Sequence, residues 1–297
     1  MRGTHPERAL EQTIERGEAI RAGTAVLAAC SGGADSVALA GALCAVAPRM
    51  HLRVTLGHVN HGARPSAWQD ECVVLCIGAA LGVPVKVRGL EIPGRDEASL
   101  REARYAALAE MARDSGATTI ATAHHAEDQS ETVLLALFRG AGPEGLSGIP
   151  ERRPLDGEFE LARPLLHAAS ETLREYCHLR ALPYAVDPTN ADREIRRNAV
   201  REALEALRPL FPGLDEAVAR AAALVGAERA GTERASLRRK VRDALADQES
   251  LRDVDFEHIE AAVRALQRGA SGRFHMKAGV TIEVESGRLS AIVRDSA

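Results

Sequence analysis

The sequence predicts an α/β protein with a parallel sheet, followed by a smaller, mostly helical domain that ends in short strands. Apolar runs of strand length alternate with helical patterns through the first two thirds of the chain, and a glycine-rich turn directly follows the first run. From about residue 211 the sequence becomes Ala- and Arg-rich and helical in pattern. Strands separated by helical patterns are typical of βαβ units. We place the domain boundary near Phe211–Pro212, giving domains of residues 1–210 and 211–297.

Each element of the first domain follows from its local pattern. Four runs rich in apolar residues predict strands, and the stretches that follow them predict helices. The expected strands are residues 24–30, 51–58, 84–90 and 118–125, and the expected helices are residues 35–46, 66–81, 97–115 and 127–139.

Glycine, proline and composition define the remaining segments. Residues 140–157 are rich in Gly and Pro and are expected to form a loop. The stretch from Phe211 to about residue 268 predicts helices. The segment that starts at Ser271 predicts short strands joined by Gly turns, which we expect to form a small hairpin.

Composition excludes several classes of protein. Hydrophobic residues make up 45% and charged residues 27% of the 297 residues, which is ordinary for a globular protein. No run of about 18 apolar residues predicts a membrane span, and the N-terminal segment has no apolar core of a signal peptide. We therefore expect a cytoplasmic protein. The five cysteines are odd in number and form no C-x-x-C pair, which argues against a disulfide framework or a structural zinc site.

Charge is unevenly distributed along the chain. The net charge is −4, yet residues 192–240 hold 11 basic and 8 acidic residues. Almost all of the basic residues are Arg, whose guanidinium group suits phosphate contacts. This segment could contact a specific RNA, although the Arg bias could equally reflect codon composition.

The strongest chemical signal is the hexapeptide Ser31-Gly32-Gly33-Ala34-Asp35-Ser36, placed between a predicted strand and a predicted helix. Two glycines let backbone N–H groups surround an anion, and the helix N-terminus adds its dipole. Asp35 could hold Mg²⁺ that bridges phosphate oxygens. The alternative is a glycine turn capped by Asp and Ser. The segment lacks the Lys of a Walker motif.

Further polar clusters follow the second and fourth predicted strands. His58, Asn60 and His61 could hold a nucleotide or form a simple polar turn. Asp128 and Glu131 are three residues apart, share a helix face and could bind an ammonium group or Mg²⁺. The alternative is that they are acids favoured by the helix dipole. Arg101 and Arg104 also share a face, where solvated surface charges are the simpler interpretation.

These segments resemble two nested families. The hexapeptide resembles the pyrophosphate loop of the N-type ATP pyrophosphatases. The order and spacing of the other segments resemble the tRNA(Ile)-lysidine synthetase family. The matching stretches are H-V-N-H-G-A-R at 58–64, R-E-A-R-Y at 101–105, H-H-A-E-D-Q-S-E-T at 124–132, R-G-A-G-P-E-G-L-S-G-I at 139–149, R-P-L-L at 163–166, D-P-T-N at 187–190 and R-N-A-V-R at 197–201. Ala63 stands where Leu is commoner in that family, and Glu127 replaces its usual Asp.

The resemblance implies a PP-loop domain of the adenine-nucleotide α-hydrolase-like class, in a short form of the enzyme, with ATP, Mg²⁺, free L-lysine and tRNA(Ile) with a CAU anticodon as ligands. It implies that lysine is joined to C2 of the wobble cytidine through an adenylated intermediate, and members of the family are often homodimers. The implied catalytic residues are Asp35, Arg104, His124 and Asp128. The implied ATP-binding residues are Ser31, Gly32, Gly33, Ala34, Asp35, Ser36, His58, Asn60, His61 and Arg104, with Asp35 also the metal ligand. The implied lysine-binding residues are Asp128 and Glu131, and the implied RNA contacts are Arg139, Arg197 and Arg201.

Three other functions share parts of this pattern. A tRNA 2-thiolase would use the same loop but normally needs a cysteine pair, which is absent as C-x-x-C. An ATP-dependent amidotransferase would need a glutaminase-like domain. An ATP-binding RNA module without catalysis would have no need for Asp35, Asp128 and Glu131 together.

Overall fold

The computed structural model describes residues 6–60, 67–90, 97–185, 195–229, 231, 233–246, 256–276 and 280–294. The chain divides into two compact units, Met1–Ala222 and Ala223–Ala297. The division falls within helix α9 (Leu214–Arg229). His61 and the 187–190 segment, both singled out from the sequence, lie outside the described residues.

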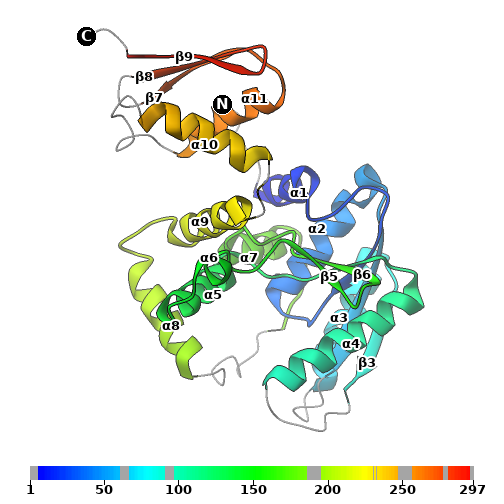
Figure 1. Ribbon diagram of the computed structural model, residues 1–297. Coiled ribbons are helices and arrows are strands. Elements are labelled where there is room, and N and C mark those ends of the chain that lie inside the picture. The colour runs from blue at the N-terminus through cyan, green and yellow to red at the C-terminus, as the bar shows by residue number, and fades with distance from the viewer. Residues whose placement is uncertain are drawn as a thin grey trace. The chain divides into compact units, whose positions relative to one another are not determined.

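A six-stranded sheet forms the centre of the first unit, in the order β3-β2-β1-β4-β6-β5 (Figure 1). All neighbouring strands run parallel except β5, which pairs antiparallel with β6. The strands are β1 (Ala25–Ala29), β2 (Arg53–Asn60), β3 (Val85–Gly89), β4 (Thr119–Ala121), β5 (Arg152–Leu155) and β6 (Phe159–Ala162). The predicted fold class, a parallel α/β sheet, is confirmed.

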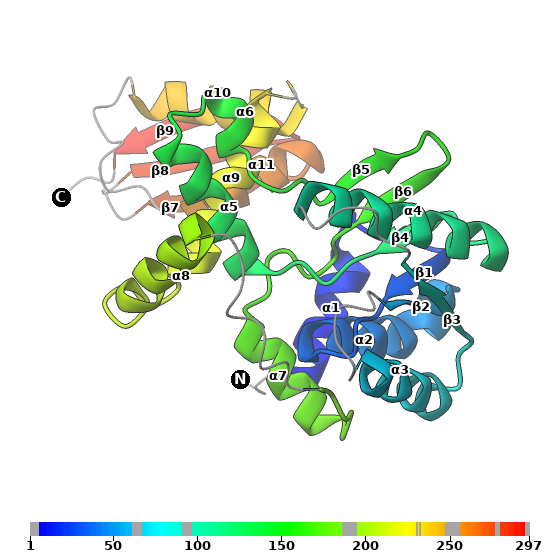
Figure 2. The ribbon, with the colours of Figure 1, turned by 90° about the horizontal axis from the view of Figure 1, so that it is seen from below.

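Helices cover both faces of this sheet. The helices of this part of the chain are α1 (Pro6–Arg16), α2 (Ala34–Met50), α3 (Ala67–Leu81), α4 (Glu97–Ser115), α5 (Ala126–Phe138), α6 (Pro143–Leu146), α7 (Ser170–Leu179) and α8 (Ile195–Leu207), of which α6 and α8 pack on α5. Figure 2 shows α2 and α3 on one side of the strands and α4 on the other. In β1, Val26 and Ala28 belong to the apolar cluster under α2, while Ala25 and Leu27 belong to the cluster under α4. A strand buried on both faces reads as a continuous apolar run, which is why the sequence revealed it.

The prediction of a plain loop over residues 140–157 is wrong. Pro143 lies at the first position of the short helix α6, where its missing N–H costs nothing. Strands β5 and β6 then form a hairpin around Asp156 and Gly157, whose φ angles are 54° and 71°. Asp-Gly with two positive φ angles is a favoured hairpin turn. The Asp-Gly pair was thus a usable signal.

The second unit combines helices with a small antiparallel sheet. Helices α10 (Glu233–Ala246) and α11 (Phe256–Gln267) precede strands β7 (Gly272–Met276), β8 (Val280–Glu285) and β9 (Arg288–Arg294), in the order β7-β8-β9. The helical character expected up to about residue 268 is confirmed for the part of this stretch that the structure describes, and three strands stand where we expected a hairpin. The core of the second unit is apolar and includes Val241, Leu245, Val263 and Ile282. Among the described residues, none of the helices combines the length and apolar character needed to cross a membrane.

Candidate nucleotide site at the strand ends

Two polar segments meet at the carboxyl edge of the sheet. Strands β1 and β4 are hydrogen-bonded neighbours, so the segments that follow them lie side by side. The first leads into α2 and the second into α5, and both helices begin at this edge. In open parallel sheets ligands bind outside the carboxyl ends of the strands. This is therefore the candidate site.

The loop after β1 has the backbone conformation that an anion-binding turn requires. Gly32 has a φ of 91°, a backbone angle that residues other than glycine rarely adopt. Ser36 holds the loop closed, since its Oγ donates to the Gly33 carbonyl at 2.9 Å and accepts from the Ser31 N–H at 3.1 Å. The first turn of α2 follows at once, so its free N–H groups face the loop.

Asp35 lies in the first turn of α2 and has an oxygen available for a cation. Its Oδ1 is buried and has no hydrogen-bond partner, and its Oδ2 lies 3.6 Å from His125 Nε2. No group of three or more His, Cys, Asp or Glu side chains is placed to hold a metal among the described residues. Mg²⁺ in nucleotide enzymes commonly uses one or two carboxylates together with substrate phosphates. A single orphaned carboxylate oxygen beside an anion loop fits that pattern.

His125 links this loop to α5. Its Nδ1 lies 2.8 Å from Glu127 Oε2, while its Nε2 lies 3.6 Å from Asp35 Oδ2 and 3.5 Å from Asp128 Oδ2. Burial alone would lower the pKa of His125, but Asp35, Glu127 and Asp128 outweigh it and raise the pKa to about 10. Desolvation is likewise outweighed at Glu127, where His125 and Ser170 lower the pKa to about 2. His125 is therefore an imidazolium among carboxylates.

His124 has the opposite environment. Its Nδ1 lies 3.0 Å from Thr122 Oγ1. Desolvation, followed by the positive charges of Arg163 and Arg101, lowers the pKa of His124 to about 3. The ring is therefore neutral, and the guanidinium groups around it create a positive potential that favours an anion.

The predicted lysine-binding and RNA-binding residues meet each other on α5 and α8. Glu131 is 3% exposed and accepts from Arg197 Nε and Arg201 Nε, each at 2.8 Å. We call these three residues the Glu131 cluster. Although desolvation opposes it, Arg201 and Arg197 lower the pKa of Glu131. The Arg197 Nη2 also lies 4.0 Å from Asp128 Oδ1. In this structure both arginines thus face a carboxylate of their own chain.

The other predicted residues occupy varied positions. His58 is buried and its Nδ1 donates to the Cys30 carbonyl at 2.9 Å, directly before the loop. Asn60 donates to Glu71 Oε2 at 3.2 Å. Arg104 and Arg139 are exposed. The loop residues, Asp35, His124 and Asp128 are therefore the predicted residues that the fold brings to the strand ends of β1 and β4.

Sequence reasoning missed three residues that shape this region. His125 was passed over in favour of His124, although both begin the same helix. Gln129 fixes the segment before β5, since its amide exchanges hydrogen bonds with the backbone of Ile149 at 2.6 and 3.1 Å. Arg163 is 2% exposed and donates to the Pro150 carbonyl at 2.6 Å. Its burial could not be read from sequence, because buried arginine is rare.

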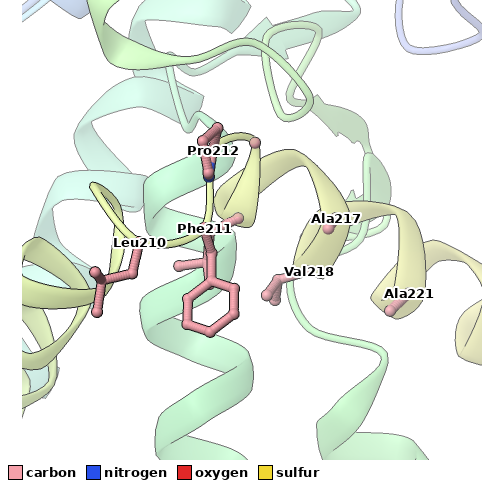
Figure 3. A pocket seen from close by; sticks show the side chains of 8 residues that line it. Leu210, Phe211, Pro212, Ala217, Val218 and Ala221 are labelled. Atoms are coloured by element: carbon pink, nitrogen blue, oxygen red, sulfur yellow. The ribbon is translucent and has the colours of Figure 1, made fainter.

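A groove elsewhere in the first unit does not suit a nucleotide. It has a volume of about 550 Å³ and lies where the chain passes into α9 (Figure 3). Its lining carries no charged side chain and consists of Leu210, Phe211, Pro212, Gly213, Leu214, Ala217, Val218 and Ala221. Without a cationic side chain, this apolar lining offers little for a phosphate.

Comparison with known proteins agrees with this geometry. A family model described as a PP-loop domain matches residues 3–207. The tRNA(Ile)-lysidine synthase of Salinispora tropica is 40% identical over 90% of this chain and 90% of its own length. Those of Salinispora arenicola and Ralstonia nicotianae are 46% and 40% identical over 69% and 67% of this chain, which spans 63% and 44% of their lengths.

A solved structure shares the fold at low identity. The U34-tRNA thiolase from Methanococcus maripaludis matches with a TM-score of 0.62 and 15% identity, covering 73% of this chain and 77% of its own. This likeness concerns the fold alone and leaves the chemistry to the residues at the strand ends.

Proposed function

The chain belongs to the tRNA(Ile)-lysidine synthase family of PP-loop proteins, and from that premise we propose that it joins free L-lysine to C2 of the wobble cytidine of tRNA(Ile) with a CAU anticodon, at the expense of ATP. The observation that carries the proposal is the meeting of the loop of residues 31–36 with Asp128 and His124 at the ends of β1 and β4. That meeting supports binding of the ATP phosphates beside a carboxylate that can bind an amine.

In the first step, the C2 oxygen of cytidine attacks the α-phosphate of ATP and pyrophosphate leaves. The N–H groups of the loop and the first turn of α2 stabilise charge on the leaving phosphates. Asp35 Oδ1 would hold Mg²⁺, which neutralises phosphate charge when bound. Neutral His124 can donate a hydrogen bond to a phosphate oxygen, and Arg104, which is exposed on α4, would add positive charge if its side chain reaches the bound ATP.

In the second step, the ε-amine of lysine attacks C2 in its neutral form, the bond from C2 to the AMP oxygen breaks, and the attacking nitrogen loses a proton as AMP leaves. Asp128 lies beside the loop and would bind the incoming ammonium group, which must lose a proton before it attacks. Glu131 already accepts one guanidinium N–H on each of its oxygens, so an ammonium group that joins Asp128 there would share the carboxylate with Arg197 and Arg201. Most of the rate would come from holding ATP, cytidine and lysine in reacting positions.

The test is incorporation of radiolabelled lysine into a tRNA(Ile) transcript with the CAU anticodon, with and without ATP, beside the methionine tRNA of the same anticodon. We expect label only in the isoleucine tRNA and only with ATP. Pyrophosphate release without lysine label would retain the adenylation step and assign a different nucleophile. The absence of both lysine label and pyrophosphate release would refute the proposal.

A further inference from the structure

Three helices begin around the His125 ring. His125 precedes the first residue of α5, Asp35 lies in the first turn of α2, and Glu127 reaches Ser170 at the first residue of α7. The Ser170 backbone N–H anchors Glu127 to α7, and we call His125, Glu127, Asp35 and Asp128 the His125 network. It joins segments that lie far apart in sequence but meet at one edge of the sheet.

The orientation of the ring is fixed from the α7 side. Glu127 accepts the Ser170 N–H at 2.9 and 3.0 Å and the Ser170 hydroxyl at 2.7 Å. The same carboxylate lies 2.8 Å from His125 Nδ1. A carboxylate held on one side by a helix start can set the position of an imidazole on the other, as second partners of metal-bound histidines do.

On the far side of the ring, Nε2 faces two carboxylates and forms a good hydrogen bond with neither. His125 Nε2 lies 3.6 Å from Asp35 and 3.5 Å from Asp128, both longer than a good hydrogen bond. Two carboxylates brought together repel each other unless a donor or cation lies between them. The ring supplies that donor and still leaves Asp35 Oδ1 without a partner.

We propose that His125 is a positioning residue, oriented by Glu127, whose Nε2 keeps Asp35 and Asp128 together so that Asp35 can bind the magnesium ion of Mg–ATP. The proposal rests on the ATP dependence of the proposed function but not on the identity of the second substrate. It gives Glu127 a role as well, since the Glu127 side chain spans the distance between the ring and α7.

Two substitutions separate the ring nitrogens. His125→Asn keeps an amide near the position of Nδ1, and Asn suits the residue before a helix, but it removes the distal nitrogen. His125→Gln places an amide near the position of Nε2. Ser170→Ala is the control, because it removes one contact of Glu127 and leaves the two backbone contacts and the ring in place.

The measurement is calorimetric titration of each protein with ATP, once with excess Mg²⁺ and once with EDTA, together with the unfolding temperature. For His125→Asn we expect Mg–ATP binding to weaken about tenfold, because nothing then lies between Asp35 and Asp128 to hold them together, with metal-free ATP binding changed less than about twofold. His125→Gln should recover most of the Mg²⁺-dependent affinity. Ser170→Ala should lower the unfolding temperature by about 2–4 °C with Mg–ATP affinity nearly unchanged.

Three results would overturn the proposal. The first is that His125→Asn binds Mg–ATP as tightly as the wild type, and the second is that it loses ATP affinity equally with and without Mg²⁺. The third is that Ser170→Ala loses as much Mg–ATP affinity as His125→Asn, which would point to simple loosening of α5 against α7. Failure of the proposed function would look different. In that case the wild-type protein would bind Mg–ATP and incorporate no lysine, and the comparison of variants would still decide the role of His125.

Discussion

At the scale of single residues, two neighbouring histidines at the start of one helix differ in charge: His124 is neutral and His125 is positively charged. His124 follows a buried strand and is surrounded by guanidinium groups, whereas His125 is surrounded by carboxylates. Nothing in the dipeptide itself distinguishes them. The difference comes from residues that the fold brings in from other elements, including Arg163 and Asp35.

The neutral state of His124 makes stability depend on pH. Its pKa is lowered from 6.5 to about 3 in the folded protein, so the unfolded chain binds one more proton between these values. The free energy of unfolding should therefore fall as pH drops from 6.5 toward 3, by up to about 1.4 kcal/mol per pH unit from this group. Urea denaturation between pH 7 and 4 measures it. In His124→Gln the unfolding free energy should depend less steeply on pH, by the equivalent of about one proton. An unchanged pH dependence would contradict the neutral state of His124.

The Glu131 cluster predicts a stability effect at a buried carboxylate. Glu131→Gln leaves two arginines facing a neutral amide, which should cost about 1–2 kcal/mol of unfolding free energy, since both arginines keep some contact with water. The matched control is Glu110→Gln, which weakens an exposed pair with Arg88 at 3.7 Å and should cost less than about 0.5 kcal/mol. Equal losses in urea denaturation would show that the cluster contributes no more than a surface pair.

At the scale of elements, the hairpin of β5 and β6 depends on the conformation of its turn. Gly157 has open space around it but a φ of 71°, so Gly157→Ala should cost about 1 kcal/mol from backbone strain alone. Gly89 has equally open space and no positive φ, so Gly89→Ala should be neutral or slightly stabilising. Thermal unfolding of the two variants separates strain from packing. A similar effect of both would refute the turn assignment.

The same scale shows what sequence could and could not predict. Strands β1, β2 and β4 and the helices after them were visible because their apolar patterns come from burial on one or both faces of a sheet. The strand expected over 118–125 ends at Ala121, because His124 and His125 already lead into α5. The loop of residues 31–36 could be predicted because its glycines and serine hydroxyls set the backbone conformation within the loop itself. The arginine partners of Glu131 lie 66 and 70 residues away, and Asp35 lies 90 residues from His125, so these pairs could not be predicted from sequence spacing.

At the scale of the whole molecule, the apolar core and the candidate site belong to the first unit. Both large apolar clusters of this unit use residues before position 183. A chain ending at Arg229, which keeps α9 whole, should therefore unfold cooperatively and bind Mg–ATP within about twofold of the full chain. Calorimetry of both proteins is the check. Loss of cooperative unfolding in the shorter chain would show that the second unit is part of the same folding unit.

The Glu131 cluster also bears on the order in which substrates bind. A lysine ammonium group approaching Glu131 competes with two guanidinium groups that are tethered to the same chain and therefore present at high local concentration. Free lysine alone is then a poor competitor, and an incoming polyanion that attracts Arg197 or Arg201 lowers the barrier to its entry. Under the proposed reaction, lysine would bind last, after ATP and tRNA, so that the amine arrives only after the cytidine has been activated; tRNA-dependent pyrophosphate release in the absence of lysine would check this order.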